Sequence, residues 1–383
     1  MRDCMTLIPP SLRSAVEPFH AMDVLSRANE KRAAGNNIVS LAVGQPSAPA
    51  PVQVREAAAA AIRDGRIGYT DALGRRDLRE AIASHYSDHY GLSVSPERVV
   101  VTTGSSAGIA LAFLGMFDPG DRIAIERPGY PAYRNIMRAL GLVPVEVPHL
   151  SEDTLLAAHE AGPLAGMLLA SPANPTGTVI EPERLAALLA TAKRLRLRAL
   201  SDEIYHRLVY GDTRDRTAIE FDDDAVVINS FSKFYCMTGW RIGWMIVPPD
   251  LVRPIERIAQ SLYISAPEAS QIGALHAFGG TDELVKVRQG YAANRDALLN
   301  ALPECGFELA ADADGAFYAW CDVGAITNDA MALSNKMLDE IGVAAPSGHD
   351  FDPQNGHRTM RFSYAGSAHE IEVAIERLRR WIG

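Results

Sequence analysis

The chain lacks several features that would point to whole classes of protein. It has only four cysteines in 383 residues, at positions 4, 236, 305 and 321, and no two of them have C-x-x-C spacing. Such scattered cysteines indicate neither a disulfide framework nor a metal site, so we expect no bound metal. No apolar run approaches the roughly 18 residues of a membrane span, so we also expect no membrane partner.

The chain also has fewer basic than acidic residues. Lys and Arg together number 37 against 47 for Asp and Glu, which gives a formal net charge of -10 at pH 7. Nucleic-acid binding requires clustered, excess Lys and Arg, so the composition argues against a nucleic-acid partner. The N-terminal apolar stretch is short and broken by Pro9 and Pro10, which argues against a signal peptide. We therefore expect a cytoplasmic enzyme.

Short apolar runs alternate with helical patterns through the middle of the chain. This alternation predicts an α/β fold, with a mostly parallel central sheet flanked by helices on both faces. The runs interpreted as strands are 99–101, 121–125, 143–147, 165–170, 197–200, 225–228 and 243–247.

The last hundred residues have a different pattern. A long helical stretch over 282–302 precedes separated strands at 316–320 and 359–364, and a helix over 370–381 closes the chain. We predict a smaller α+β domain, built from the N- and C-terminal segments. The expected parts are an arm and part of the small domain at 1–45, the large cofactor-binding domain at 46–279, and the small C-terminal domain at 280–383.

Lys233 has an unusual position for a lysine. It directly follows the buried-strand pattern at 225–228 and precedes Arg241 by eight residues. Removal of a lysine from water lowers its ammonium pKa and frees the amine to attack carbonyl groups. Lys233 therefore indicates Schiff-base chemistry, which in proteins most often involves pyridoxal phosphate.

Gly104, Ser105 and Ser106 lie where a strand turns into a helix. Free backbone N–H groups and the helix dipole at such a turn suit a phosphate, although a plain helix cap has the same pattern. Hydroxyls and a guanidinium near the lysine suit a phosphate dianion as well: Ser230, Ser232 and Arg241.

Four further polar residues follow predicted strands or turns. Asp202 ends a strand that should be buried, so it requires a partner, either a local arginine or helix cap, or the ring nitrogen of a cofactor. Tyr205 can hydrogen-bond a ring oxygen or belong to the core. Asn174 begins a turn signature that can face the crevice or the surface. Tyr130 can stack on a planar cofactor or simply pack.

Five segments, taken in order, resemble the class I and II pyridoxal-phosphate aminotransferases. They are S-P-A-N-P-T-G (171–177), S-D-E-I-Y (201–205), N-S-F-S-K (229–233), M-T-G-W-R-I-G-W (237–244) and R-F-S-Y-A (361–365). The resemblance runs nearly end to end and implies the fold-type I architecture of the aspartate aminotransferase-like superfamily.

The resemblance implies a role for each matching residue. Lys233 would be the catalytic, Schiff-base lysine, and Asp202 the partner of the ring nitrogen. Tyr130 would stack on the ring, while Tyr205 and Asn174 would contact the ring oxygen. The implied phosphate ligands are Gly104, Ser105, Ser106, Ser230 and Arg241. The implied site for the substrate α-carboxylate is Arg361, assisted by Asn174 and the Gly44 backbone.

Tyr69 matches a tyrosine that reaches the phosphate of the neighbouring subunit, which implies a homodimer with shared active sites. Two segments depart from the family pattern. Gly44-Gln45-Pro46-Ser47-Ala48 replaces the usual Gly-Glu-Pro-Asp-Phe, and Ser106-Ala107 replaces a frequent Gln-Gln. Both departures change the rim of the site, where substrate preference is set.

The activity implied is a ping-pong transamination, in which an L-amino acid gives its amino group to a 2-oxo acid. A pyridoxal-phosphate C–S β-lyase on the same fold is an alternative. A regulatory or binding protein without catalysis is another, although the lysine, aspartate, tyrosine and arginine are all present. The amino donor stays open among acidic, aromatic and aliphatic amino acids, because Arg361 would recognise any α-carboxylate.

Overall fold

The computed structural model of the chain describes residues 8–382. Cys4 and the first residues of the N-terminal apolar stretch lie outside this range. Within it, no helix is long and apolar enough to cross a membrane, and no group of three or more His, Cys, Asp or Glu side chains is arranged to hold a metal ion. The described cysteines are buried and unpaired.

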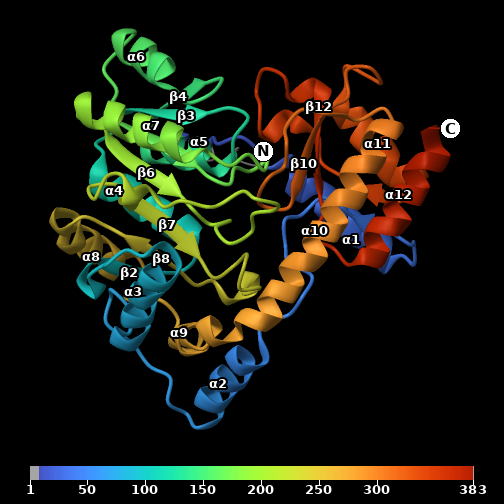
Figure 1. Cartoon of the computed structure of the whole chain (residues 1–383). Coiled ribbons are helices and arrows are strands. Elements are labelled where there is room, and N and C mark those ends of the chain that lie inside the picture. The colour runs from blue at the N-terminus through green and yellow to red at the C-terminus, as the bar shows by residue number, and fades with distance from the viewer. Residues whose placement is uncertain (1–7, 383) are drawn as a thin grey trace, which may run out of the picture.

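A seven-stranded sheet forms the larger part of the molecule (Figure 1). Its strands are β2 (Val99–Thr102), β3 (Arg122–Glu126), β4 (Val143–Val147), β5 (Gly166–Ala170), β6 (Arg198–Asp202), β7 (Val226–Ser230) and β8 (Gly243–Ile246). The spatial order is β2-β8-β7-β6-β5-β3-β4. Only β8 runs antiparallel to its neighbours, so the prediction of a mostly parallel sheet is confirmed.

Helices cover both faces of this sheet. One face packs against α4 (Ser105–Met116), α5 (Ala132–Leu140) and α8 (Pro249–Tyr263), and the other against α3 (Arg76–Tyr90), α6 (Glu152–Glu160) and α7 (Pro182–Arg194). Successive strand residues alternate between the two cores: Val100 belongs to the first, and Val99 and Val101 to the second. Burial on both faces explains why the strands read as continuous apolar runs.

The second part of the molecule combines both ends of the chain. Strand β1 (Val39–Ser40) pairs in parallel with β11 (Val343–Ala344). A three-stranded antiparallel sheet has the order β12 (Thr359–Ser363), β10 (Tyr318–Asp322), β9 (Glu308–Leu309). The helices here are α1 (His20–Ala33), α10 (Thr281–Glu304), α11 (Ala330–Glu340) and α12 (Ala368–Ile382). The N- and C-terminal segments thus form the smaller α+β part, while the boundaries at 45/46 and 279/280 stay predictions.

The remaining elements connect these parts. Helices α2 (Val52–Arg63) and α9 (Glu268–Leu275) pack together at the lower end of Figure 1, and α10 runs from there towards the smaller sheet. Short 3-10 turns are η1 (Leu12–Ser14), η2 (Pro96–Arg98), η3 (Ala218–Glu220), η4 (Thr238–Trp240), η5 (Ala277–Gly280), η6 (Gly348–Asp350) and η7 (Gly356–Arg358).

Candidate active site

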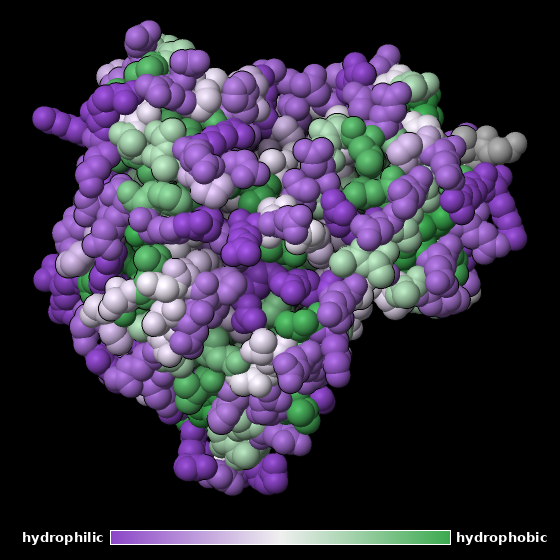
Figure 2. All heavy atoms as spheres, viewed as in Figure 1, coloured by the Kyte–Doolittle hydropathy of each residue, from purple (hydrophilic) through white to green (hydrophobic). Residues whose placement is uncertain are grey.

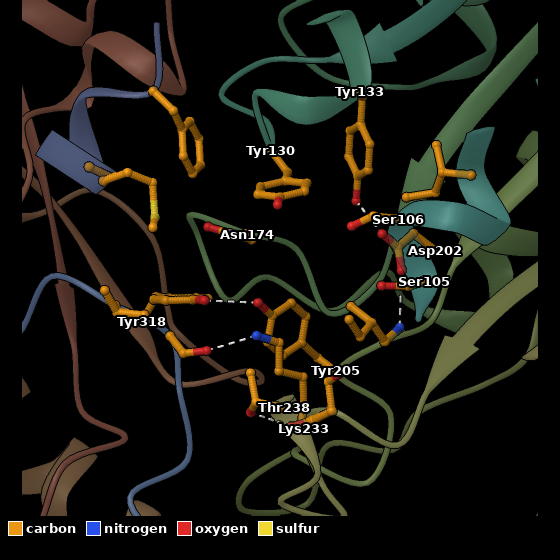
Figure 3. Close-up of a pocket in the computed structure, with 18 of the residues that line it drawn as sticks. Ser105, Ser106, Tyr130, Tyr133, Asn174, Asp202, Tyr205, Lys233, Thr238 and Tyr318 are labelled. Atoms are coloured by element: carbon orange, nitrogen blue, oxygen red, sulfur yellow. Dashed lines mark hydrogen bonds between the residues drawn. The ribbon is translucent and has the colours of Figure 1, made fainter. Parts of the chain in front are cut away.

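A pocket lies at the carboxyl ends of the parallel strands, where the large sheet faces the smaller one (Figure 3). This is the edge at which ligands bind in open α/β sheets. The structure brings most of the predicted site residues together here. Those that line the pocket are Gly44, Ser105, Ser106, Tyr130, Asn174, Asp202, Tyr205, Ser232, Lys233, Arg241 and Arg361.

Lys233 follows β7 and extends into this pocket. Its ammonium nitrogen donates a hydrogen bond of 2.7 Å to the carbonyl oxygen of Gly44. Burial, together with the positive charges of Arg361 and Arg241, lowers the pKa of Lys233 to about 8, while the Asp202 carboxylate acts in the opposite direction. A substantial fraction of the Lys233 side chain is therefore a neutral amine at mildly alkaline pH.

Asp202, at the end of β6, is a buried carboxylate. It accepts hydrogen bonds from the Tyr133 hydroxyl (2.5 Å) and the Ile204 backbone N–H (3.1 Å), and burial raises its pKa. Within the described residues no Lys or Arg forms an ion pair with it. The local-arginine alternative is therefore not observed, and the carboxylate suits a protonated ring nitrogen.

Two predicted tyrosines flank the space above the lysine. Figure 3 shows the Tyr130 ring across the cavity from Lys233, in edge contact with Tyr133, at 5.4 Å between ring centroids. The Tyr205 hydroxyl lies 2.8 Å from the hydroxyl of Tyr318. The Lys233 nitrogen is 5.7 Å from the Tyr205 ring centroid, and both tyrosines line the same pocket as the lysine.

The phosphate corner predicted at the start of α4 is assembled around Arg241. Gly104 precedes this helix with a φ of 86°. A Cβ on Gly104 would lie 2.6 Å from the Arg241 Nη2 atom, so the guanidinium rests directly against the glycine. Ser105 and Ser106 start the helix, whose first N–H groups have no partner within it. This corner therefore combines backbone donors, a hydroxyl-bearing turn and a cation.

Ser230 lies behind this corner and does not line the pocket. Its hydroxyl donates to the Ile242 carbonyl oxygen at 3.0 Å and lies 2.9 Å from the Ser232 hydroxyl, which does line the pocket. Ser230 can therefore orient the Ser232 hydroxyl without facing the pocket itself.

Arg361, on β12, is a buried cation that forms no ion pair with an Asp or Glu within residues 8–382. It is 4 % exposed, and it donates to the Asn174 side-chain oxygen (2.8 Å) and the Ala42 carbonyl oxygen (2.6 Å). Its Nε atom has no partner among the described residues. The guanidinium lies over the rings of Tyr318 (4.3 Å) and Phe351 (4.6 Å). A planar, pre-oriented guanidinium of this kind suits a substrate carboxylate.

Tyr69 is the one predicted site residue far from this pocket. It lies in the loop between α2 and α3, and it is 83 % exposed. The loop is held by bonds from the Gly68 N–H to Glu268 (2.5 Å) and from Gln271 to the Thr70 hydroxyl (2.9 Å). Tyr69 therefore does not contribute to the site of its own chain.

Several lining residues were not predicted from the sequence: Phe19, Met22, Tyr133, Thr238 and Tyr318. Tyr133 could have been found, because it lies three residues after Tyr130, at the start of α5. Tyr318 lies two residues from Trp320, the cross-strand partner of Arg361, so it shares the face of Arg361. The sequence carries no signal that would have placed Phe19 or Met22 here.

Comparisons with known proteins agree with this geometry. Residues 36–378 match the family described as Aminotransferase class I and II. The chain is 45 % identical to the valine–pyruvate aminotransferase of Mycobacterium tuberculosis, over 97 % of this chain and 98 % of that protein. It superposes with a TM-score of 0.95 on the crystal structure of an aminotransferase from the same organism, with 44 % identity, 98 % of this chain and 99 % of that one covered.

The fold is shared more widely. The aspartate aminotransferase of Thermus thermophilus with maleate superposes with a TM-score of 0.91 and 30 % identity, over 98 % of this chain and 100 % of that one. The family match spans all three sheets of the described residues and every described residue that lines the pocket beyond residue 35. The chain therefore belongs to the class I and II aminotransferases, which are pyridoxal-phosphate-dependent enzymes.

Proposed function

We propose that this chain binds pyridoxal phosphate in the pocket and transfers the amino group of an L-amino acid with an apolar side chain to a 2-oxo acid. The observation that carries the proposal is the relation of three charged groups. Lys233, whose pKa is lowered, lines the same pocket as Asp202 and Arg361. Within residues 8–382 the buried Asp202 carboxylate has no ion pair with a Lys or Arg, and the buried Arg361 guanidinium has none with an Asp or Glu. Each unpartnered charge suits one end of a cofactor–substrate pair.

The residues of the pocket fit the cofactor group by group. Asp202 would hold the ring nitrogen, Tyr130 would cover the ring face, and Tyr205 and Asn174 would contact the ring oxygen. The phosphate would be held by Gly104, Ser105, Ser106, Ser232 and Arg241, with Ser230 behind them. When bound, pyridoxal phosphate supplies an aldehyde that condenses with amines and a ring that accepts the electron pair of a Cα–H bond.

Lys233 is the group suited to carry the proton. As a neutral amine it accepts the proton from the substrate Cα, and as an ammonium it can return that proton to another carbon within reach. A base with a pKa close to the working pH is the most effective in such a transfer. The lowered pKa of Lys233 supports this role. A 2-oxo acid entering in the second half of a ping-pong cycle would require the same proton steps in reverse.

Arg361 would bind the α-carboxylate and so orient the substrate. The Asn174 oxygen and the Ala42 carbonyl hold two of the guanidinium nitrogens, which fixes the plane of the guanidinium before substrate arrives. Because the Asn174 oxygen accepts from Arg361, the amide N–H groups of Asn174 stay available to the substrate carboxylate or the ring oxygen. Such preorganisation reduces the cost of ordering the complex.

The apolar residues that line the pocket favour a substrate with an apolar side chain. Phe19, Met22 and Val43 contribute apolar surface to the wall of the pocket. The cations that line the pocket within residues 8–382 are Lys233, Arg241 and Arg361, and each already has a proposed role. No described cation is left for a side-chain carboxylate. The name of the Mycobacterium tuberculosis relative, valine–pyruvate aminotransferase, agrees with this preference, and we infer valine-type donors and pyruvate-type acceptors.

A homodimer with shared sites is also part of the proposal. Exposed apolar side chains occur in the loop that carries Tyr69 and at the end of α8: Ile67, Leu262 and Ile264 are 44 %, 58 % and 47 % exposed. A hydrogen bond from the Thr70 N–H to the Ser265 hydroxyl joins the two segments. Figure 2 shows apolar groups at the end of the molecule where α2 and the following loop lie. A patch of this kind suits a second copy of the chain, through which Tyr69 would reach the phosphate of the neighbouring site. The cytoplasmic location stays a prediction.

The proposal is tested by a single half-reaction. The purified chain loaded with pyridoxal phosphate is mixed with excess valine, alanine or aspartate, without an acceptor, while the visible absorbance band and the released products are followed. Loss of the band with one 2-oxo acid per site, faster with valine than with aspartate, is the expected result. Ammonia release from an S-substituted cysteine without transfer would instead support the β-lyase alternative.

A further inference from the structure

Tyr318 connects the smaller sheet to the proposed cofactor site. It lies on β10, and its hydroxyl is 2.8 Å from the hydroxyl of Tyr205, which follows β6 (Figure 3). Both tyrosines are buried, at 2 % and 5 % exposure. The Tyr318 hydroxyl forms no other hydrogen bond within the described residues. This phenol has no assigned role in the binding scheme above.

The direction of this hydrogen bond follows from counting protons. A phenol carries one O–H donor. If Tyr205 donates that proton to the ring oxygen of the cofactor, its own oxygen can only accept from Tyr318. The cofactor-bound site therefore requires the order Tyr318 to Tyr205 to ring oxygen, whichever way the bond points before binding.

Gly44 makes room for the Tyr318 hydroxyl. A Cβ at position 44 would lie 1.7 Å from the Tyr318 hydroxyl oxygen and 2.8 Å from the Phe317 ring. Any residue with a side chain there would displace Tyr318. The carbonyl oxygen of the same Gly44 accepts the hydrogen bond from Lys233, so the position of Tyr318 is coupled to the loop that holds the lysine.

The ring of Tyr318 has a separate contact. The Arg361 guanidinium carbon is 4.3 Å from the Tyr318 ring centroid. This contact arises from strand register, because Trp320 pairs with Arg361 and Tyr318 pairs with Ser363, which puts Tyr318 diagonally across from Arg361 on one face. The hydroxyl therefore acts on Tyr205 and the ring acts on Arg361. A Tyr318→Phe substitution removes the first contact and keeps the second.

We propose that Tyr318 is a positioning residue with two functions. Its hydroxyl donates to Tyr205 and strengthens the hydrogen bond from Tyr205 to the cofactor ring oxygen, while its ring holds the Arg361 guanidinium in place for the substrate carboxylate. This inference rests on the proposed function, in which Tyr205 contacts that oxygen.

The hydroxyl has a measurable consequence. Consecutive hydrogen bonds polarise one another, so loss of the Tyr318 donor makes Tyr205 a weaker donor. A hydrogen bond to the ring oxygen favours its deprotonated, negatively charged form. When the hydrogen bond from Tyr205 is weaker, the deprotonated form of the bound cofactor is less favoured. The apparent pKa read from the visible band of the holoenzyme should therefore rise.

The experiment is a spectrophotometric pH titration of the holoenzyme, without substrate, for four proteins: the native chain, Tyr318→Phe, Tyr205→Phe and the double variant. We expect Tyr318→Phe to raise the apparent pKa of the visible band by about 0.5 unit, the size of one modest neutral hydrogen bond. Tyr205→Phe should raise it further. In the double variant, the Tyr318 substitution should add nothing, because the residue through which it acts is gone.

Tyr291→Phe is the matched control. Its hydroxyl is buried and forms no hydrogen bond within the described residues, so its loss should leave the titration unchanged. An unshifted titration in Tyr318→Phe, or equal shifts in the presence and absence of the Tyr205 hydroxyl, would overturn the inference. If Tyr205→Phe itself produces no shift, the assignment of Tyr205 in the proposed function fails instead, and the two failures are distinguishable.

A second pair of variants tests the ring. Tyr318→Phe keeps an aromatic face under Arg361, whereas Tyr318→Leu removes it. We expect the KM for the amino acid to stay within about twofold of the native value in Tyr318→Phe and to rise about tenfold in Tyr318→Leu, in line with a buried cation–π contact. Equal KM values for the two variants would contradict the proposed function of the ring.

Discussion

The Lys233 ammonium is bonded to the Gly44 carbonyl oxygen at 2.7 Å, which links the segment after β7 to the segment after β1. The two residues are 189 positions apart. The bond holds the lysine on the side of the pocket that the smaller sheet covers, and condensation of the amine with an aldehyde would release it. Gly44 therefore matters in two ways: its carbonyl oxygen accepts the hydrogen bond from Lys233, and its lack of a side chain leaves room for Tyr318.

The amine of Lys233 should react at a lower pH than any other lysine. A lysine whose pKa falls from 10.5 to about 8 is already half neutral at about pH 8, and only the neutral form is nucleophilic. Competitive acylation of the cofactor-free chain across a pH series, followed by peptide mass spectrometry, measures this midpoint. The internal controls are the other lysines, Lys31, Lys193, Lys286 and Lys336.

Arg361 should influence the pH midpoint at which Lys233 becomes reactive towards acylation. Its positive charge is the largest contributor after burial to the lowered pKa of Lys233. Arg361→Gln should therefore move the Lys233 midpoint upward, towards 10.5. A midpoint that stays in place would show that the charge of Arg361 does not lower the pKa of Lys233, which leaves burial and Arg241 as the causes.

Asp202→Asn should slow the chemistry while the protein stays folded. The amide has nearly the same shape, but it removes the negative charge that would keep the ring nitrogen protonated. Loss of one preorganised electrostatic contact costs about 10²–10³-fold in rate. The rate of band loss after mixing with valine measures the effect. Asp202→Glu keeps the charge and should retain more activity than Asp202→Asn; the reverse order would refute the role of Asp202.

Arg361→Lys should impair recognition of the α-carboxylate despite its unchanged charge. A lysine provides a point charge in place of a planar fork, and it loses the bonds to Asn174 and Ala42. We expect kcat/KM for valine to fall about 10–100-fold, the range of a lost charge-assisted hydrogen bond. An amine without a carboxylate serves as the control substrate and should be much less affected. An equal loss for both substrates would assign Arg361 to the fold instead of the substrate.

Tyr69 and Lys233 should complement each other between subunits. A Tyr69→Ala chain keeps its own Lys233 but can no longer supply a tyrosine to the site of its neighbour. A Lys233→Ala chain can supply the tyrosine but has no lysine in its own site. In a mixed dimer, one site would combine the intact Lys233 of one chain with the intact Tyr69 of the other. Activity should therefore return when the two inactive variants are unfolded and refolded together. A mixture as inactive as its components would rule out a shared site.

The sequence predicted the parts of the site that follow strands. Asp202 and Lys233 could be found because a polar residue at the end of an apolar run marks the carboxyl edge of a parallel sheet. The direction of β8 could not be predicted, because a short apolar run carries no information about strand direction. Its antiparallel pairing with β2 and β7 depends on contacts between distant segments.

Tyr318, Phe19 and Met22 show where sequence reasoning stops. Tyr318 reaches the site only through the register of β10 against β12. Phe19 precedes α1 and Met22 lies in its first turn, where both resemble ordinary packing residues in the sequence. All three line the pocket because the N- and C-terminal segments fold back over the large sheet. Such long-range packing leaves no local pattern, and substrate preference depends on it.

The central claim, that Lys233 is the lysine that joins the cofactor, has a direct test. The chain is incubated with pyridoxal phosphate, reduced with borohydride, digested and mapped by mass spectrometry, beside Lys233→Ala and the surface control Lys286→Ala. The label should reside on Lys233 at about one per chain, in the native protein and in Lys286→Ala, and should be absent from Lys233→Ala together with the visible band. Stoichiometric label on another lysine, or an unchanged band in Lys233→Ala, would contradict the account.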